Sequence, residues 1–244
     1  MIQVEGLRKH FGEVRAVDGV SFSAADGTVT GLLGPNGAGK TTALRMIYGL
    51  MRADSGRILV DGIDVGADPL AAQARLGVLP DLSGLYPRLT PREHIRYFGE
   101  LQGMSPADID IRMRELIEVL DMGSIAERRT GGFSHGERTK VALARALVHH
   151  PRNVLLDEPT NGLDVMSTRS VREIVRRLRS EGKCVVFSSH VMQEVSALCD
   201  SIVVIAHGRV VANGTSEELL ALTNRSNLED AFVSLVGLGE QETR

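Results

Sequence analysis

Short apolar runs separated by turn residues recur along the chain, and their lengths predict strands. The first ~30 residues alternate apolar and polar positions between Gly-containing turns, which is typical of strands. A further strand that ends in an Asp-Gly turn is predicted at RILVDG, residues 57–62. The remaining runs predict fully buried strands over residues 29–33, 153–157, 184–189 and 201–206.

Apolar positions at helical spacing, together with helix-start signals, predict helices between these strands. One helix is expected over about residues 39–48, and another is expected after Asp164. The second carries one apolar stripe at i, i+3, i+4 and i+7, made of Val171, Ile174, Val175 and Leu178. A capping box at residues 215–218 opens a last core helix. Strands that alternate with helices in this way indicate an α/β fold.

The middle of the chain, from about residue 82 to 150, has a different character, because it is rich in helix signals. Thr90, Pro91 and Glu93 combine a capping box with proline at the first helical position. Ser105 starts another helix, whose apolar residues at helical spacing include Met113, Leu116, Ile117 and Leu120. We therefore predict a helical subdomain inserted into the α/β core.

The end of the chain, beyond about residue 223, is a short tail with an apolar group. This group consists of Leu228, Phe232, Val233, Leu235 and Val236. We expect the tail to form a helix that packs on the body of the protein. The predicted organisation is thus one domain over residues 1–222, with its helical subdomain at about 82–150, and a helical tail over residues 223–244.

Composition limits the classes of function. A chain of 244 residues with 43% hydrophobic content can form one large α/β domain or two small ones. The net charge of −3 argues against a nucleic-acid partner. Cys184 opens an apolar run, so a buried thiol is expected. No stretch approaches ~20 apolar residues, so a role at a membrane would need a separate partner chain.

The strongest candidate for chemistry is the glycine-rich segment GPNGAGKTT, which fits G-x-x-x-x-G-K-[ST] between a predicted strand and a predicted helix. Glycines let successive backbone N–H groups turn toward a phosphate, and the helix N-terminus adds positive potential. Lys40 supplies a full charge to the phosphate oxygens, and the Thr41 hydroxyl can bind Mg²⁺. The predicted phosphate loop consists of Gly34, Pro35, Asn36, Gly37, Ala38, Gly39, Lys40, Thr41 and Thr42.

Two adjacent carboxylates follow the apolar strand at residues 153–157. Asp157 is predicted to reach Mg²⁺ directly or through water, as an acidic residue at the end of a second strand does in P-loop enzymes. Glu158 is predicted to act as a base on the attacking water. An acidic pair after a strand is more often a solvated turn, but the phosphate loop upstream favours the catalytic interpretation.

With these residues in place, the chain resembles the nucleotide-binding subunit of ATP-binding cassette (ABC) transporters over roughly residues 1–222. The resemblance implies a P-loop core of the ABC ATPase type with an N-terminal antiparallel β region. FSHGE, residues 133–137, resembles the family signature, and NGLD, which ends at Asp164, resembles its D-loop. His190 matches the switch histidine that contacts the γ-phosphate, and Phe11 matches the aromatic residue that stacks on adenine. Simple packing of Phe11 and a surface position of His190 are the alternatives.

The signature segment has two compatible interpretations. Ser134 and Glu137 form a capping box, so they open a helix on local grounds alone. In the family, this helix N-terminus faces the γ-phosphate held by a second subunit, so the resemblance implies that Ser134, Gly136 and Glu137 act in trans. The expected partner is a second ATPase subunit, either an identical chain or a paralogue.

Two positions depart from the family pattern. The usual signature is close to L-S-G-G-Q, whereas His135 and Glu137 replace the first glycine and the glutamine here. The glutamine of the family's Q-loop would fall near Asp81, which could still meet a metal. Both departures could reduce or retune hydrolysis without abolishing the site.

The stretch over residues 78–104 resembles the branch of ABC ATPases that serves prokaryotic exporters, with sodium extrusion favoured over drug or antibiotic export. The resemblance implies ATP and Mg²⁺ as ligands and a separate transmembrane permease as partner. It also implies a peripheral location on the cytoplasmic face of the membrane. We expect the permease contact around residues 81–91.

Three other functions remain open from the residues alone. A soluble ABC ATPase acting on ribosomes or DNA usually has two cassettes or long coiled coils, which this chain lacks. A P-loop kinase would need an acceptor site and would not need the FSHGE or NGLD segments. A regulatory cassette with little turnover fits Asp81 and Glu137 but not Glu158 and His190.

Overall fold

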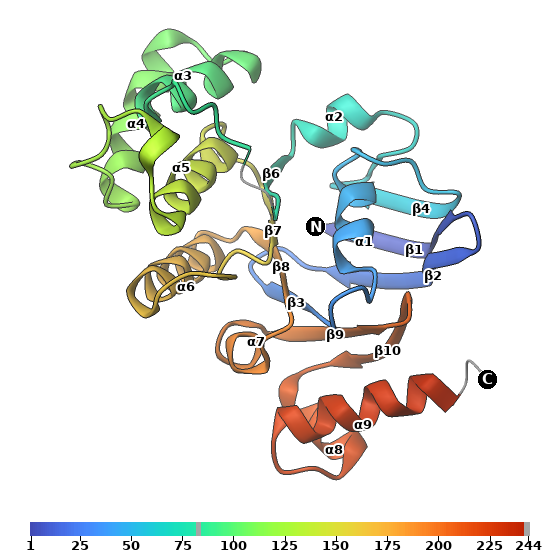
Figure 1. Cartoon of the computed structure of the whole chain (residues 1–244). Coiled ribbons are helices and arrows are strands. Elements are labelled where there is room, and N and C mark those ends of the chain that lie inside the picture. Colours follow the sequence, from blue (N-terminus) through green and yellow to red (C-terminus); the bar gives the residue numbers. More distant parts are fainter. Residues whose placement is uncertain (82–83, 242–244) are drawn as a thin grey trace.

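The computed structural model describes residues 1–81 and 84–241, and within them the strands form two sheets (Figure 1). The smaller sheet is antiparallel with the order β2-β1-β4-β5. Its strands are β1 Ile2–Phe11, β2 Val14–Ala24, β4 Ser55–Val60 and β5 Ile63–Asp64. The N-terminal strands and the strand-turn at residues 57–62 are therefore confirmed.

The larger sheet has the order β10-β9-β3-β8-β7-β6, and all its pairs are parallel except that of β10 with β9. Its strands are β3 Val29–Leu33, β6 Leu76–Leu79, β7 Asn153–Asp157, β8 Cys184–Ser189, β9 Ser201–Ala206 and β10 Arg209–Gly214. Every residue of β3, β7 and β8 is buried. Continuous apolar runs are expected here, because a parallel sheet is covered on both faces.

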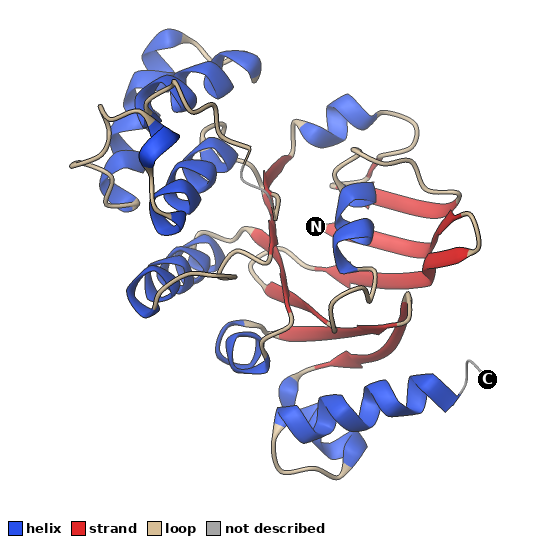
Figure 2. Cartoon of the chain, viewed as in Figure 1, coloured by secondary structure: helices blue, strands red, loops and turns tan. Residues whose placement is uncertain are grey.

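Helices cover both faces of the larger sheet (Figure 2). The helix α1, Lys40–Ile47, packs between the two sheets, and its buried side chains share one core with β1 and β3. On the other face lie α6, Val165–Ser180, and α7, Met192–Leu198. The predicted apolar stripe of α6 is confirmed, since all four of its residues are buried. A short α2, Pro69–Gln73, connects the two sheets.

The middle of the chain is helical and lies to one side of the larger sheet, where its last helix packs on β6 (Figure 1). It contains α3 Pro91–Leu101, α4 Pro106–Val119, the 3₁₀ turn η1 Thr130–Gly132 and α5 His135–Leu147. The caps predicted at Thr90 and Ser105 are confirmed, because each side-chain oxygen accepts a hydrogen bond from a backbone N–H three residues later. Residues 82 and 83, at the start of the predicted subdomain, lie outside the described residues.

The chain ends in two helices, α8 Ser216–Thr223 and α9 Leu228–Gln241. The helix α9 packs on β9 and β10, with Leu228, Phe232 and Leu235 buried. The expected packing of a tail helix on the body is confirmed, although Val233 of the apolar group is 65% exposed. One residue along a helix turns the side chain by about 100°, so Val233 faces solvent while its neighbour Phe232 faces the sheet. The division between a domain and a tail at residue 222 stays a prediction.

No helix within residues 1–81 and 84–241 combines the length and the apolar character needed to cross a membrane.

Candidate active site

The glycine-rich loop runs from the end of β3 into α1, and close backbone approaches explain its glycines. A Cβ atom on Gly34 would lie 2.3 Å from the carbonyl oxygen of Ile205, and one on Gly39 would lie 2.3 Å from that of Ala16. Gly39 also has φ +104°, in the region that favours glycine. The loop is therefore pressed against β2 and β9, which fixes the direction of its backbone N–H groups.

This loop forms one wall of a pocket of about 340 Å³. Loop residues Asn36 to Thr42 line it, and Asp81 and Glu158 enter from other segments. The predicted phosphate loop, base and Q-loop position, which come from three separate parts of the sequence, thus meet at one cavity. The volume and the inward-facing loop fit a polyphosphate chain.

The Lys40 ammonium is buried and held from three sides. It donates hydrogen bonds to the carbonyl oxygens of Gly34, at 2.7 Å, and Pro35, at 3.2 Å. Its Nζ also lies 3.2 Å from Oε1 of Glu158. The loop therefore positions a full positive charge in the pocket and balances it with the predicted base. Phosphate oxygens that enter the pocket would compete with Glu158 for this ammonium group.

Glu158 is the point where the predicted catalytic groups converge. Its Oε2 lies 2.9 Å from Nδ1 of His190, so the structure brings together two residues that are 32 positions apart. Its backbone has φ +48°, an uncommon conformation for a residue with a side chain. The Glu158 N–H donates to Oγ of Ser188 at 2.9 Å, which helps to hold this conformation.

Asp157, the predicted metal ligand, is buried at the end of β7. Its Oδ1 accepts a hydrogen bond from the Ser188 hydroxyl at 2.6 Å. Burial raises the pKa of this carboxyl, and the charges of Asp81 and Glu158 act in the same direction. Hydrogen bonds from Ser188 and Thr41 lower the pKa and oppose this effect. A bound cation would relieve the cost of burying the ionised carboxylate.

The donor set fits Mg²⁺ that arrives with a nucleotide. The Thr41 hydroxyl and the Asp157 carboxylate lie side by side, and hard oxygen donors of this kind suit Mg²⁺. Among the described residues there is no cluster of three or more His, Cys, Asp or Glu side chains that could hold a metal alone. Phosphate oxygens would therefore have to complete the coordination, as they do in P-loop enzymes.

The predicted signature residues do not line this pocket. Ser134 caps α5, and its N–H donates to the Glu137 carboxylate at 2.8 Å, so the predicted capping box is confirmed. This backbone hydrogen bond lowers the pKa of the Glu137 carboxyl. A Cβ atom on Gly136 would lie 2.5 Å from Oγ of Ser167, so a side chain there would force the Ser167 hydroxyl on α6 to move. The roles of these three residues in trans stay predictions.

Two further predicted residues lie outside the pocket. Asp164 caps α6, and its Oδ1 accepts hydrogen bonds from the N–H groups of Met166 and Ser167, both at 2.9 Å. Phe11 is 48% exposed, with the Lys9 ammonium 5.7 Å from its ring centroid. An exposed ring is free to stack on a base, and adenine stacking by Phe11 stays a prediction.

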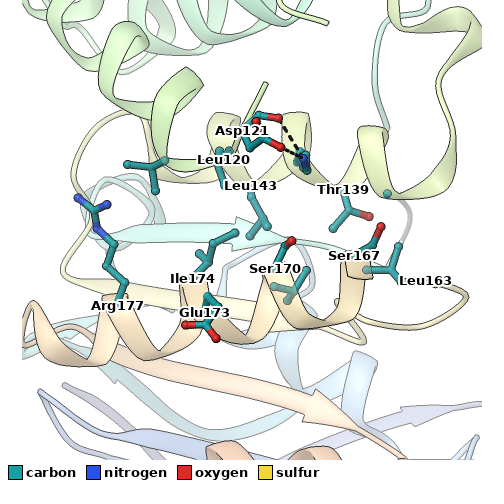
Figure 3. A pocket seen from close by; sticks show the side chains of 14 residues that line it. Leu120, Asp121, Thr139, Leu143, Leu163, Ser167, Ser170, Glu173, Ile174 and Arg177 are labelled. Atoms are coloured by element: carbon teal, nitrogen blue, oxygen red, sulfur yellow. Dashed lines mark hydrogen bonds and ion pairs between the residues drawn. The ribbon is translucent and has the colours of Figure 1, made fainter. Parts of the chain in front are cut away.

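A second cavity, of about 390 Å³, separates the middle of α5 from α6 (Figure 3). Its walls are largely apolar and include Leu120, Leu143 and Ile174. At its edge, Nζ of Lys140 donates to the carbonyl oxygen of Asp121 at 3.0 Å. The cavity begins at Gly136 and Ser167, near the N-terminal ends of the two helices, and extends along them to Leu143 and Arg177.

Sequence reasoning missed two polar residues of this region, Ser188 and Glu194. Ser188 bridges Asp157 and Glu158, while the buried Glu194 contacts the loop after β7. The sequence gives only weak signals for them. Both lie within four residues of His190, and Glu194 shares the buried face of α7 with the apolar residues Val195 and Leu198.

A family model described as ABC transporter matches residues 17–161, which is more than half of the chain. The chain belongs to the ABC transporter family. ABC transporter ATP-binding protein NatA of Bacillus subtilis (strain 168) is 45% identical over 222 residues, 91% of this chain and 90% of that protein. Linearmycin resistance ATP-binding protein LnrL of the same organism is 37% identical over 219 residues, 90% of this chain and 70% of that protein.

A solved structure of an ATP-binding subunit of an ABC transporter matches this ABC ATPase with a TM-score of 0.89 at 27% identity. The match covers 96% of this chain and 99% of that one, so the predicted fold class is confirmed. Members of the family are ATP-hydrolysing transporter subunits, and this ABC ATPase is therefore an enzyme that binds and hydrolyses ATP.

Proposed function

We propose that this ABC ATPase drives export, with Glu158 as the base that activates water and His190 as its partner at the γ-phosphate. The observation that carries the proposal is the pair of contacts that Glu158 makes, one with Lys40 in the phosphate pocket and one with His190. The Glu158 carboxylate, proposed to act on the water, thus lies 3.2 Å from the Lys40 ammonium, which serves the phosphate, and 2.9 Å from the His190 imidazole.

In this proposal each side chain has a distinct task. The loop N–H groups and Lys40 bind the phosphates, and Glu158, released from Lys40, accepts a proton from the attacking water. His190 holds the other oxygen of Glu158 and so orients its carboxylate. Thr41 and Asp157 would hold Mg²⁺, which neutralises charge on the phosphate oxygens when it is bound.

A second ATPase subunit, identical or paralogous, is proposed to complete the site. Val165 and Met166, next to Asp164, are 84% and 70% exposed, an apolar pair suited to burial against another chain. The N-terminus of α5 at Ser134 has the polarity to face a phosphate held by that chain. ATP would therefore lie between two cassettes and close them when it binds.

A separate permease is proposed as the membrane partner, which would place this subunit at the cytoplasmic face. A cavity of about 350 Å³ opens between the α/β core and the helical region, lined by apolar residues such as Leu50, Val78 and Phe98. The exposed rings of Tyr86 and Tyr97 lie on the same helical region. An amphipathic segment of a permease fits such a surface.

Sodium ion is the proposed cargo, and drug or antibiotic export is the alternative. The sequence resemblance supports sodium, whereas the relative named for linearmycin resistance supports a drug. Flux assays of the ATPase together with its permease would decide, with sodium efflux expected and antibiotic efflux as the result that would contradict the sodium assignment.

The test of the chemistry is Glu158→Gln. Loss of a positioned base lowers turnover by about 10²–10⁴-fold, while ATP binding should stay intact and an ATP-bound dimer should accumulate. Glu173→Gln is the control, because Glu173 is an exposed glutamate of α6 whose ion pair with Arg176 lies away from the pocket. Undiminished hydrolysis in Glu158→Gln would show that another group activates the water.

A further inference from the structure

Glu194 is a buried carboxylate with partners from three separate segments. It lies on α7 and is 5% exposed. Its Oε2 accepts hydrogen bonds from the hydroxyls of Thr160 and of Ser189, the latter at 3.3 Å. Its Oε1 lies 3.7 Å from Nη2 of Arg172 on α6. A buried charge is costly unless it is paired and hydrogen-bonded, so these contacts explain how the carboxylate is tolerated.

The partners of Glu194 lie on the two segments that carry the proposed catalytic pair. Thr160 comes two residues after Glu158. Ser189 comes immediately before His190, and its hydroxyl also accepts the N–H of Val191 at 3.0 Å. One carboxylate therefore joins the chain beyond Glu158 to the chain on both sides of His190.

The connection runs parallel to the direct contact between Glu158 and His190. That contact spans 2.9 Å and depends on the relative position of two loops, which follow the neighbouring strands β7 and β8. Strand pairing aligns the loops only up to their first residues, because the ladder ends at Asp157 and Ser188. The hydrogen bonds from Thr160 and Ser189 to Glu194 add a second fixed point beyond the ends of the strands.

We propose that Glu194 is a positioning residue that sets the geometry of Glu158 and His190 for hydrolysis. The inference rests on the proposed function of that pair. Glu194 does not line the phosphate pocket and is not part of the loop that binds phosphate. Its replacement should therefore lower the rate of turnover and leave the affinity for ATP unchanged. Its link to Arg172 extends the connection to the middle of α6, whose N-terminus Asp164 caps.

The test compares Glu194→Gln and Thr160→Val with the wild type. Glu194→Gln removes the charge and weakens all three contacts, and Thr160→Val removes one hydroxyl while it keeps the side-chain volume. Misplacement of reacting groups by about 1 Å costs up to about 10²-fold, so we expect turnover to fall by about tenfold or more in both variants. ATP affinity should change by less than about twofold, in line with a role in orientation only.

Glu181→Gln is the matched control, since Glu181 pairs with Arg177 at the exposed end of α6 and should leave turnover unchanged. If Glu194→Gln does not fold, Thr160→Val decides by itself. Turnover at the wild-type level in Thr160→Val, or an equal loss of ATP affinity and turnover, would overturn the proposal.

A coupling measurement separates positioning from general structural support. In a His190→Ala background, Glu194→Gln should lower turnover by less than about twofold further, because residues that act as a unit are not additive. A purely structural role would lower turnover by the same factor in both backgrounds. If His190→Ala and Glu158→Gln leave turnover intact, the proposed function fails; if they lower it and the Glu194 and Thr160 variants do not, only this inference fails.

Discussion

Replacing Ser188 tests how the site holds the adjacent acidic residues Asp157 and Glu158 in place. Its hydroxyl donates to Oδ1 of Asp157 at 2.6 Å and accepts the N–H of Glu158 at 2.9 Å. Ser188→Ala removes one atom and breaks both contacts, and the buried position leaves no room for bulk water to replace them. The variant should therefore be destabilised even though its change in volume is small.

The size of the effect follows from the two hydrogen bonds. A hydrogen bond to an ionised group is worth about 1.5–3 kcal/mol, and a buried donor left without an acceptor costs about 1–3 kcal/mol. The Glu158 N–H is only partly buried, and the two losses share one oxygen, so they do not add in full. We expect the free energy of unfolding to fall by about 2–4 kcal/mol at neutral pH.

The loss of unfolding free energy in Ser188→Ala should depend on pH, and the structure determines whether it grows or shrinks as pH rises. Burial raises the pKa of Asp157 above its ordinary value of 3.8, and the Ser188 hydroxyl limits this rise. Ser188→Ala therefore raises the pKa of the folded protein further, while the unfolded chain is unaffected. A raised folded-state pKa contributes stability that is complete below the unfolded pKa and is lost as pH rises through the folded pKa. The variant should thus lose stability relative to wild type as pH rises.

Urea unfolding of both proteins at about pH 4.5 and about pH 8 measures this difference, provided the slope with urea stays the same. The control is Asp157→Asn, because a neutral amide cannot titrate and Ser188→Ala should then cost the same at both pH values. A destabilisation below about 0.5 kcal/mol, or one equal at both pH values with Asp157 present, would refute the reasoning.

Three further predictions concern the loop, the tail and the Q-loop position. Gly39→Ala should abolish ATP binding, because its Cβ would lie 2.3 Å from a backbone carbonyl oxygen. In Gly37→Ala the new Cβ meets no atom within 4 Å, so the free energy of ATP binding should weaken by only about 1 kcal/mol. Calorimetric titration with ATP compares the two variants. Phe232→Ala should lower the free energy of unfolding by about 3 kcal/mol and the exposed Val233→Ala by under about 0.5 kcal/mol, as urea unfolding would show. Asp81→Gln should change the Mg²⁺ concentration for half-maximal hydrolysis, and an unaltered ATPase assay would mean that the Q-loop is wrongly placed.

Much of the fold was predictable because its signals are local. The buried strands over residues 153–157, 184–189 and 201–206 were predicted to the residue, since fully buried parallel strands appear as continuous apolar runs. The caps at Thr90 and Ser134 were predictable because a capping box needs only four successive residues. The apolar group of the tail also contains Val233, which lies off the helix face formed by Leu228, Phe232 and Leu235 and is exposed.

The candidate site divides in the same way. The sequence by itself determined the phosphate loop from Gly34 to Thr42 and the carboxylates that follow a strand, because motif and flanking elements are contiguous. The tertiary structure alone decided which segments meet: β8 pairs with β7, so Ser188 reaches Asp157 and His190 reaches Glu158. Likewise, the tertiary structure places Gly136 beside Ser167 of α6, and it gives the buried charge of Glu194 its partners on three segments. The physical reason is that strand order depends on the free energy of pairing between distant segments, which no local pattern of apolar and polar residues encodes.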